Sequence, residues 1–221
     1  MEEPKKDEPL KIEAEEHEKK KRFSTLRAAL ICFASMSVLT GIIYPVTVTV
    51  ISQAVFPYQS NGSQITVTLK DGSKKTYGSE LIGQSYENPI HLFGRVNLGS
   101  PSNLSPTSDE YKALLAKRVQ ERKEKLSKIG YEESGIPLEL LTSSGSGVDP
   151  HISPETAYFQ VPVIVKARNQ ASGYMDDSQS NLTQENVKAI IDKYTEGRFL
   201  GLFGEKRVNV LLVNLSLDGE L

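Results

Sequence analysis

Residues 23–56 read FSTLRAALICFASMSVLTGIIYPVTVTVISQAVF, and this stretch decides how the rest of the chain is organised. No Asp, Glu, Lys or Arg occurs from Ala28 to Leu69. About 20 apolar residues in a helix cross the hydrocarbon core of a bilayer, and a helix satisfies its own backbone hydrogen bonds there. We therefore predict one transmembrane helix over residues 23–56, between a charged tail and a second domain.

Basic residues lie close to only one end of this span. Residues 19–22 and Arg27 are all Lys or Arg, whereas the next cation after the span is Lys70. An excess of Lys and Arg marks the cytoplasmic side of a span. The pattern predicts a single-pass protein of the plasma membrane, with residues 1–22 in the cytoplasm and residues 57–221 outside.

A cleaved signal peptide is the alternative interpretation of the same stretch. It shares the basic front end, and Ser52-Gln53-Ala54 resembles a small-x-small cleavage site. The apolar region of a signal peptide is only about 7–15 residues long, which favours the uncleaved anchor.

Composition limits what the flanking segments can do. The chain has 221 residues, a net charge of −2 and a single cysteine, Cys32, inside the span. Near-neutral charge gives no sign of nucleic-acid binding, and the domain after the span can form no internal disulfide. Residues 1–22 are charged and nearly devoid of apolar residues, so we predict that they are disordered.

Within the span, small residues suggest a surface for another helix. Ser37 and Gly41 form a small-xxx-small pair, a spacing that lets two helices approach closely but also occurs by chance. Pro45 follows Tyr44, lacks a backbone donor and should kink or end the regular helix.

The remaining residues, 57–221, predict a single α+β domain. Alternating apolar residues indicate strands, and 3.6-residue periodicity with caps indicates helices. The predicted strands are Ile65–Leu69, Lys75–Ile82, Pro137–Thr142 and a long central Arg207–Leu217. The predicted helices begin after Thr107 or Ser108 and end at Gly130, begin after Ser153 and break near Pro162, and span Asn186–Tyr194. Long polar loops are predicted over residues 83–107 and 170–181.

Several kinds of chemistry find little support. Ser144, Asp149 and His151 are the residue types of a hydrolase triad, but three members within one loop rarely reach the required geometry. The histidines lie far apart without metal-ligand spacing, and no phosphate-binding Gly-x-x-x-x-Gly-Lys loop occurs. Four Asn-x-Ser/Thr sequons begin at Asn61, Asn103, Asn181 and Asn214, and these can be accidental matches.

Residues 140–168, LLTSSGSGVDPHISPETAYFQVPVIVKAR, closely resemble the signature of the C subunit of the potassium-transporting Kdp P-type ATPase. Further stretches agree in order: LTGIIYPVTVTVISQAVFP, NGSQI, GSELIGQSY, FGR, SNLSPTSDEY and TEGRFLGLFGEKRVNVLLVNLSLD. The resemblance covers about residues 24–218. The chain departs from the family at Val96-Asn97, where Pro-Ser is usual, in a longer tail and in an expanded segment from Thr66 to Tyr77.

The resemblance implies a non-catalytic subunit of a high-affinity potassium uptake pump. The implied partners are a channel-like potassium-translocating subunit, an ATP-hydrolysing P-type subunit, a small hydrophobic subunit and membrane lipid. The family is described as a catalytic chaperone that raises the ATP affinity of the pump. This chain lacks the Asp-Lys-Thr-Gly phosphorylation motif, so ATP and K⁺ are expected to act at the level of the complex, with no cofactor bound by this chain itself.

The predicted topology places the domain across the membrane from cytosolic ATP, so an effect on ATP affinity is expected to be indirect. By resemblance, we expect partner-binding or loop-fixing roles for Gln84, Arg95, Ser144, Gly145, Gly147, Asp149, His151, Glu196 and Arg198. Packing within the membrane is expected at Ser37, Gly41, Tyr44 and Pro45. Two other hypotheses remain at this point: a free-standing membrane-anchored sensor and a secreted hydrolase.

Overall fold

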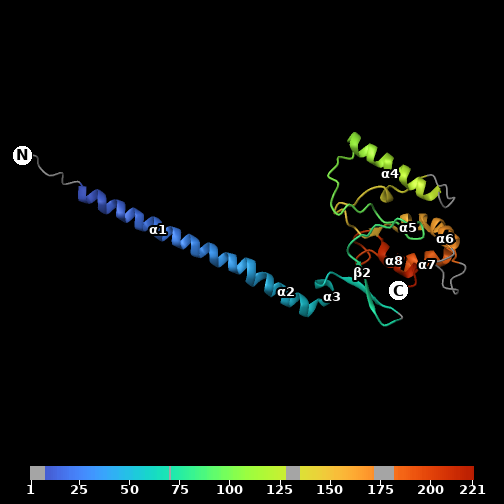
Figure 1. Cartoon of the computed structure of the whole chain (residues 1–221), viewed down its shortest axis with the longest axis horizontal. Helices are drawn as coiled ribbons and strands as arrows, with labels where there is room; N and C mark the ends of the chain where they lie inside the picture. Colours follow the sequence, from blue (N-terminus) through green and yellow to red (C-terminus); the bar gives the residue numbers. More distant parts are fainter. Residues whose placement is uncertain (1–7, 70, 128–134, 172–181) are drawn as a thin grey trace, which may run out of the picture. The chain divides into compact units, whose positions relative to one another are not determined.

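The computed structural model describes residues 8–69, 71–127, 135–171 and 182–221. The chain divides into two compact units, Met1–Asn61 and Gly62–Leu221, and each is considered by itself (Figure 1).

The first unit is almost entirely helical. It consists of α1 (Glu8–Val38), the π-helical turn η1 (Leu39–Ile43), α2 (Tyr44–Val55) and the short α3 (Pro57–Ser60). Residues Lys20–Val55 form one helix long and apolar enough to cross a membrane. The predicted long apolar helix is confirmed, while its membrane insertion and its orientation stay predictions.

Pro45 disturbs the helix as predicted, although the helix continues past it. The turn just before it is π-helical, and Tyr44 donates its backbone N–H to the carbonyl of Leu39. Proline cannot donate to the carbonyl four residues earlier, and a widened turn is one way for a helix to absorb that defect. The side chains of Thr40 and Thr47 also bond carbonyls of the preceding turn, those of Met36 and Ile43.

Helix α1 also covers much of the segment for which the sequence predicts disorder. Residues 1–7 lie outside the described part of the chain, but helix is present from Glu8 onwards. Glu, Lys and Ala dominate residues 8–22 and are all good helix formers, so the residue types there favour a continuation of the helix beyond its apolar part. Helix α1 therefore continues without a break through Phe23, where the sequence predicts the boundary between tail and span.

The second unit begins with a two-stranded antiparallel hairpin, which confirms the first predicted strand pair. Strand β1 (Gln64–Thr68) pairs with β2 (Lys74–Ser79), with an irregular register between Ile65 and Thr66. The predicted loop follows, and no strand or helix occurs between Ser79 and Asp109.

Helix α4 (Asp109–Ser127) is also as predicted. Its cap is Ser108, whose Oγ accepts the backbone N–H of Tyr111. The predicted end at Gly130 falls outside the described residues.

Two of the predicted strands are wrong. Residues Leu138–Leu140 form a 3₁₀ turn, η2, in which Pro137 accepts the N–H of Leu140. The long central strand shrinks to β5 (Arg207–Asn209), after which the chain turns into helix α8 (Val210–Leu217). Asn209 caps α8, because its side chain accepts the N–H of Leu212. This helix is apolar on all sides and buried, so its sequence shows no amphipathic period.

A small antiparallel sheet and four helices enclose the main core. Strand β5 lies between β3 (His151–Ile152) and β4 (Thr195–Glu196). Helices α5 (Pro154–Phe159) and α6 (Val161–Gln170) meet near Pro162, as the predicted break requires, and α7 (Gln184–Lys193) packs on both. The core comprises Leu92, Ile152, Ala157, Val161, Ile164, Val187, Ile191, Val208, Val210, Val213 and Leu217.

Side-chain amides hold the long loop against this core. Asn214 Oδ1 accepts the N–H of Leu92 at 2.7 Å, and its Nδ2 donates to the Leu92 carbonyl at 2.9 Å. Gln160 does the same for Phe93, at 2.9 and 3.1 Å. A buried loop needs partners for its backbone groups, and these two amides provide them in place of a strand.

Candidate functional site

The residues singled out by the sequence meet mainly at the loop before β3. Ser144 Oγ accepts the backbone N–H groups of Gly147 and Asp149, at 2.9 and 3.2 Å. Asp149 Oδ1 in turn accepts from the backbone of His151 at 3.0 Å and lies 3.2 Å from its Nδ1. The loop is therefore fixed by its own serine and aspartate side chains.

An arginine and a glutamate link this loop to two other segments. Arg95 donates from Nη2 to Glu139 Oε1 at 2.5 Å, and its Nε lies 3.8 Å from Asp149 Oδ2. The other oxygen of Glu139 accepts from the backbone and hydroxyl of Ser153, at 3.0 and 2.8 Å. Burial raises the pKa of Glu139, but hydrogen bonds from Ser153 and Thr156 and the charge of Arg95 outweigh it and hold the pKa below its usual range.

Two glycines let neighbouring backbones pass in contact with the loop. Gly147 has φ +77°, and a Cβ atom there would overlap the carbonyl group of Ser100 and lie 2.9 Å from its nitrogen. A Cβ atom on Gly83 would lie 2.6 Å from the carbonyl oxygen of Asp149. Gly145, by contrast, has nothing within 4 Å of a Cβ position. Gly147 is thus required by its surroundings and Gly145 is not.

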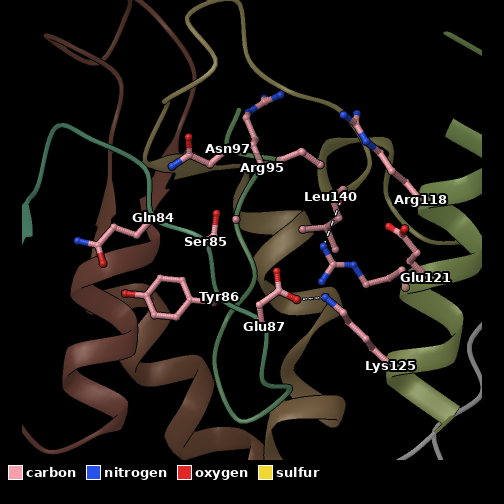
Figure 2. Close-up of a pocket in the computed structure, with 13 residues that line it drawn as sticks. Gln84, Ser85, Tyr86, Glu87, Arg95, Asn97, Arg118, Glu121, Lys125 and Leu140 are labelled. Carbon is pink, nitrogen blue, oxygen red and sulfur yellow. Dashed lines mark hydrogen bonds and ion pairs between the residues drawn. The ribbon is translucent and has the colours of Figure 1, made fainter. Parts of the chain in front are cut away.

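Beside the loop lies a pocket of about 200 Å³ (Figure 2). Its walls come from the long loop, from η2 and from one face of α4. Its lining residues are Gln84, Ser85, Tyr86, Glu87, Gly94, Arg95, Val96, Asn97, Arg118, Glu121, Arg122, Lys125 and Leu140. Basic side chains outnumber acidic ones here, as the four cations Arg95, Arg118, Arg122 and Lys125 face the two acids Glu87 and Glu121.

Most of that basic charge is engaged in holding α4 on the domain. Arg118 donates to the Leu141 carbonyl at 2.8 Å, and Lys125 pairs with Glu87, a contact that Figure 2 shows. Arg122 stacks 4.2 Å above the ring of Phe93. Burial lowers the pKa of Arg122, while the charge of Glu87 acts in the opposite direction. The pocket is therefore a polar gap between α4 and the long loop before it, and most of its basic side chains hold the two together.

The other predicted residues lie apart from the loop before β3. Gln84 lines the pocket and donates to the Tyr77 carbonyl at 2.8 Å. Glu196 ends β4 and pairs with Arg207 of β5 at 2.7 Å. Arg198 follows in an exposed turn and pairs with Glu205 at 2.9 Å. Since His151 and Glu196 both lie in strands beside β5, one sheet carries the two groups of residues on its opposite edges.

In the first unit, the predicted packing residues share an exposed helix. Ser37 lies in α1, Gly41 in η1, and Tyr44 and Pro45 begin α2. A Cβ atom on Gly41 would meet nothing within 4 Å, and Tyr44 is 66% exposed. Their role in packing on another helix stays a prediction.

The geometry gives no support to hydrolase chemistry. Ser144 Oγ accepts two backbone N–H groups and forms no hydrogen bond with His151, whose Nδ1 faces Asp149 instead. Among the described residues there is also no group of three His, Cys, Asp or Glu side chains able to hold a metal ion. What the arrangement can do is present a rigid polar surface.

Sequence reasoning missed three residues that matter here. The sequence predicts a strand at Glu139, and it predicts no contact for the side-chain amides of Asn214 and Gln160. No local pattern identifies them, since their partners Arg95, Leu92 and Phe93 are 44, 122 and 67 residues away.

The comparisons with known proteins agree with each other. A sequence model described as "K+-transporting ATPase, c chain", KdpC, matches residues 26–219. The potassium-transporting ATPase KdpC subunit of Clostridium perfringens is 46% identical over 212 residues, covering 89% of this chain and 98% of that protein. The KdpC subunit of Clostridium botulinum (strain Alaska E43) is 42% identical over 209 residues, covering 87% and 94%. The chain therefore belongs to the KdpC family of subunits of the K⁺-transporting ATPase.

Proposed function

We propose that this chain is a non-catalytic accessory subunit that anchors itself by the helix Lys20–Val55 and places its second unit on the extracytoplasmic side. The excess of Lys and Arg before the apolar segment supports this orientation. The partners would be a channel-like potassium-translocating subunit, an ATP-hydrolysing P-type subunit and a small hydrophobic subunit. The second unit would sit at the extracytoplasmic mouth of the potassium-translocating subunit.

The observation that carries this proposal is how the loop from Ser144 to His151 is built. The Ser144 side chain accepts hydrogen bonds from the loop's own backbone. Glu139 fixes Ser153 just after the loop, and the backbone of Ser100 lies against Gly147 within it. A catalytic loop needs a free nucleophile near a base, whereas a docking loop needs a fixed shape. The loop meets the second requirement.

An effect of this subunit on ATP affinity would then be conformational. A domain outside the membrane cannot touch cytosolic ATP, but it can bind one state of the pump better than another and so shift the population toward the state that binds ATP tightly. We propose this indirect mechanism for the chaperone activity that the family resemblance implies. Direct nucleotide binding by this chain is not part of the proposal.

The proposal is tested by purification of the tagged full-length chain in mild detergent. Recovery of a P-type ATPase and a channel-like protein is expected, together with a lower KM for ATP when the chain is present than when it is absent. Recovery of the chain alone, under conditions that preserve other membrane complexes, would contradict the assignment of partners.

Orientation is tested separately by cysteine labelling of intact cells. In a Cys32→Ser background, Leu138→Cys places a thiol at a position that is 62% exposed in the second unit, and Lys20→Cys places one at the first residue of the spanning helix, among the basic residues that precede its apolar part. A membrane-impermeant maleimide is expected to label only the Leu138→Cys variant. Labelling of the Lys20→Cys variant alone would reverse the proposed topology.

A further inference from the structure

A short turn between β4 and β5 exposes four large apolar side chains. Phe199, Leu200, Leu202 and Phe203 are 72%, 76%, 76% and 64% exposed. The turn is closed by two backbone hydrogen bonds between Phe199 and Phe203, at 2.8 and 3.0 Å. Residues 199–203 are called the apolar tip below. Exposed apolar side chains gathered in this way mark contact sites rather than ordinary surface.

The backbone of the apolar tip strengthens this interpretation. Leu200 has φ +52° and is followed by Gly201 with φ +76°. Glycine or asparagine would adopt the left-handed conformation of residue 200 with less strain than leucine. The turn itself does not require a leucine at this strained position. The exposed apolar side chain of Leu200 therefore points to a function in contact with another surface.

Polar pairs surround the base of the tip. Arg198 pairs with Glu205 at 2.9 Å, and Glu196 pairs with Arg207 at 2.7 Å. The exposed Lys206 lies between Glu205 and Arg207 in the sequence. The segment is thus apolar at its end and charged at its base, with more cations than acids. This is the distribution of an element that dips into hydrocarbon while its charged groups stay among lipid headgroups.

Strand β5, which follows the tip, contacts a segment that is also partly apolar and exposed. Asn209 of β5 donates to the Glu80 carbonyl at 2.8 Å, and Glu80 donates its N–H to the Ser63 carbonyl at 3.1 Å. Leu81 and Ile82, which follow Glu80, add two further apolar side chains that are 57% and 52% exposed.

We propose that the apolar tip inserts into the lipid interface of the membrane that the chain spans. It would act as a second membrane contact of the chain. The inference rests on the membrane span of the proposed function, but it needs no partner subunit. The occupant is the bilayer surface itself, because an apolar end on a charged base with more cations than acids fits the boundary between hydrocarbon and lipid headgroups.

The natural absence of tryptophan provides the test. The full-length Phe203→Trp variant, reconstituted alone into nanodiscs of phosphatidylcholine and phosphatidylglycerol, carries a single tryptophan at the tip. We expect its emission to shift to shorter wavelength and to be largely lost when the lipids carry a quencher on the upper acyl chain. The matched control is Leu138→Trp, at an exposed leucine in η2, which should keep the emission of a water-exposed indole.

A second variant separates insertion from folding. Leu200→Asn and Leu202→Ser, added to Phe203→Trp, remove apolar groups while asparagine tolerates the left-handed backbone. Lipid quenching should fall with no change in the far-UV circular dichroism spectrum.

Three outcomes would overturn the proposal. If the Phe203→Trp variant incorporates into nanodiscs but emits like the control, the tip does not enter lipid. If its tryptophan becomes shielded only when the other pump subunits are added, the occupant is a protein. If the chain does not incorporate into nanodiscs at all, the membrane span fails, and the proposed function fails with it.

Discussion

Arg95 and Glu139, 44 residues apart, form an ion pair at 2.5 Å that joins the long loop to the turn η2. The pair is only partly exposed, with 28% of the Arg95 side chain and 17% of the Glu139 side chain accessible. Glu139 also accepts hydrogen bonds from Ser153, the cap of α5, so one carboxylate joins three segments around the loop from Ser144 to His151.

Replacing this carboxylate should therefore weaken both stability and assembly. For Glu139→Gln we expect a loss of about 1–3 kcal/mol in the free energy of unfolding, because Arg95 loses its charged partner in a half-buried site. Thermal unfolding of the detergent-solubilised chain, followed by circular dichroism, measures it. The matched control is Glu121→Gln on α4, whose side chain is 55% exposed and lies 3.8 Å from Lys117, and which should change stability by less than about 0.5 kcal/mol. Equal effects of the two substitutions would contradict the role given to Glu139.

Acid should weaken the domain through Asp218 in particular. Burial raises the pKa of Asp218, but hydrogen bonds from His91 and Arg168 and their charges outweigh it and lower the pKa overall. A carboxylate with a lowered folded-state pKa stabilises the fold above its unfolded pKa of about 3.9 and loses that contribution as pH falls through the folded value.

The measurement is the difference in melting temperature between the parent chain and Asp218→Asn, recorded from pH 7 down to pH 3. The difference should be largest at pH 7 and shrink below about pH 4, because the unfolded chain then takes up a proton that the folded carboxylate takes up only at a lower pH. A difference that stays constant over this range would show that the charge of Asp218 is not what stabilises the contact with Arg168.

Two glycines in the loop from Ser144 to His151 allow a comparison of matched substitutions. Gly147→Ala places a methyl group against the Ser100 backbone at φ +77°, so we expect a loss of about 1–3 kcal/mol in stability, or a displaced loop. Gly145→Ala meets nothing within 4 Å and should be nearly neutral.

Assembly with the pump provides the functional measurement for the same pair. Under the proposed function, the Gly147→Ala chain should co-purify with less of the ATPase and give less stimulation at low ATP than the Gly145→Ala chain. If Gly147→Ala is as active and as stable as Gly145→Ala, the fixed shape of this loop is not required.

Local signals predicted much of this fold. The apolar segment, the β1–β2 hairpin, the Ser108 cap of α4 and the break near Pro162 each follow from residues close together in the sequence. The sequence predicts disorder over residues 1–22 because they are polar, whereas the structure has helix from Glu8. The Glu, Lys and Ala residues there favour helix despite their polarity.

The two wrong strand predictions fall on short apolar runs in which the sequence shows neither a helical nor a strand periodicity. Residues 210–217 are apolar apart from Asn214 and Ser216 and are mostly buried, and such a run does not distinguish a buried strand from a buried helix. The Asn209 cap is the signal that would have divided the predicted strand into β5 and α8. The loop from Ser144 to His151 stands out by its residue types, and its role in docking stays a prediction, whereas the contacts of Glu139 with Arg95 and Ser153 depend on tertiary packing.

The last prediction concerns the buried amide that replaces a strand partner for the long loop. Asn214 is 1% exposed, and its side chain satisfies both the N–H and the carbonyl of Leu92. Asn214→Leu leaves these two buried groups without partners, so we expect a loss of about 2–4 kcal/mol in the free energy of unfolding. Denaturant unfolding measures this loss, and faster amide hydrogen exchange at Leu92 should accompany it. The control is Asn169→Ala, which removes an exposed amide with one hydrogen bond to Leu182 and should lower stability by less than about 1 kcal/mol. Retention of slow exchange at Leu92 in the Asn214→Leu variant would mean that packing alone holds the loop, and that this amide is dispensable.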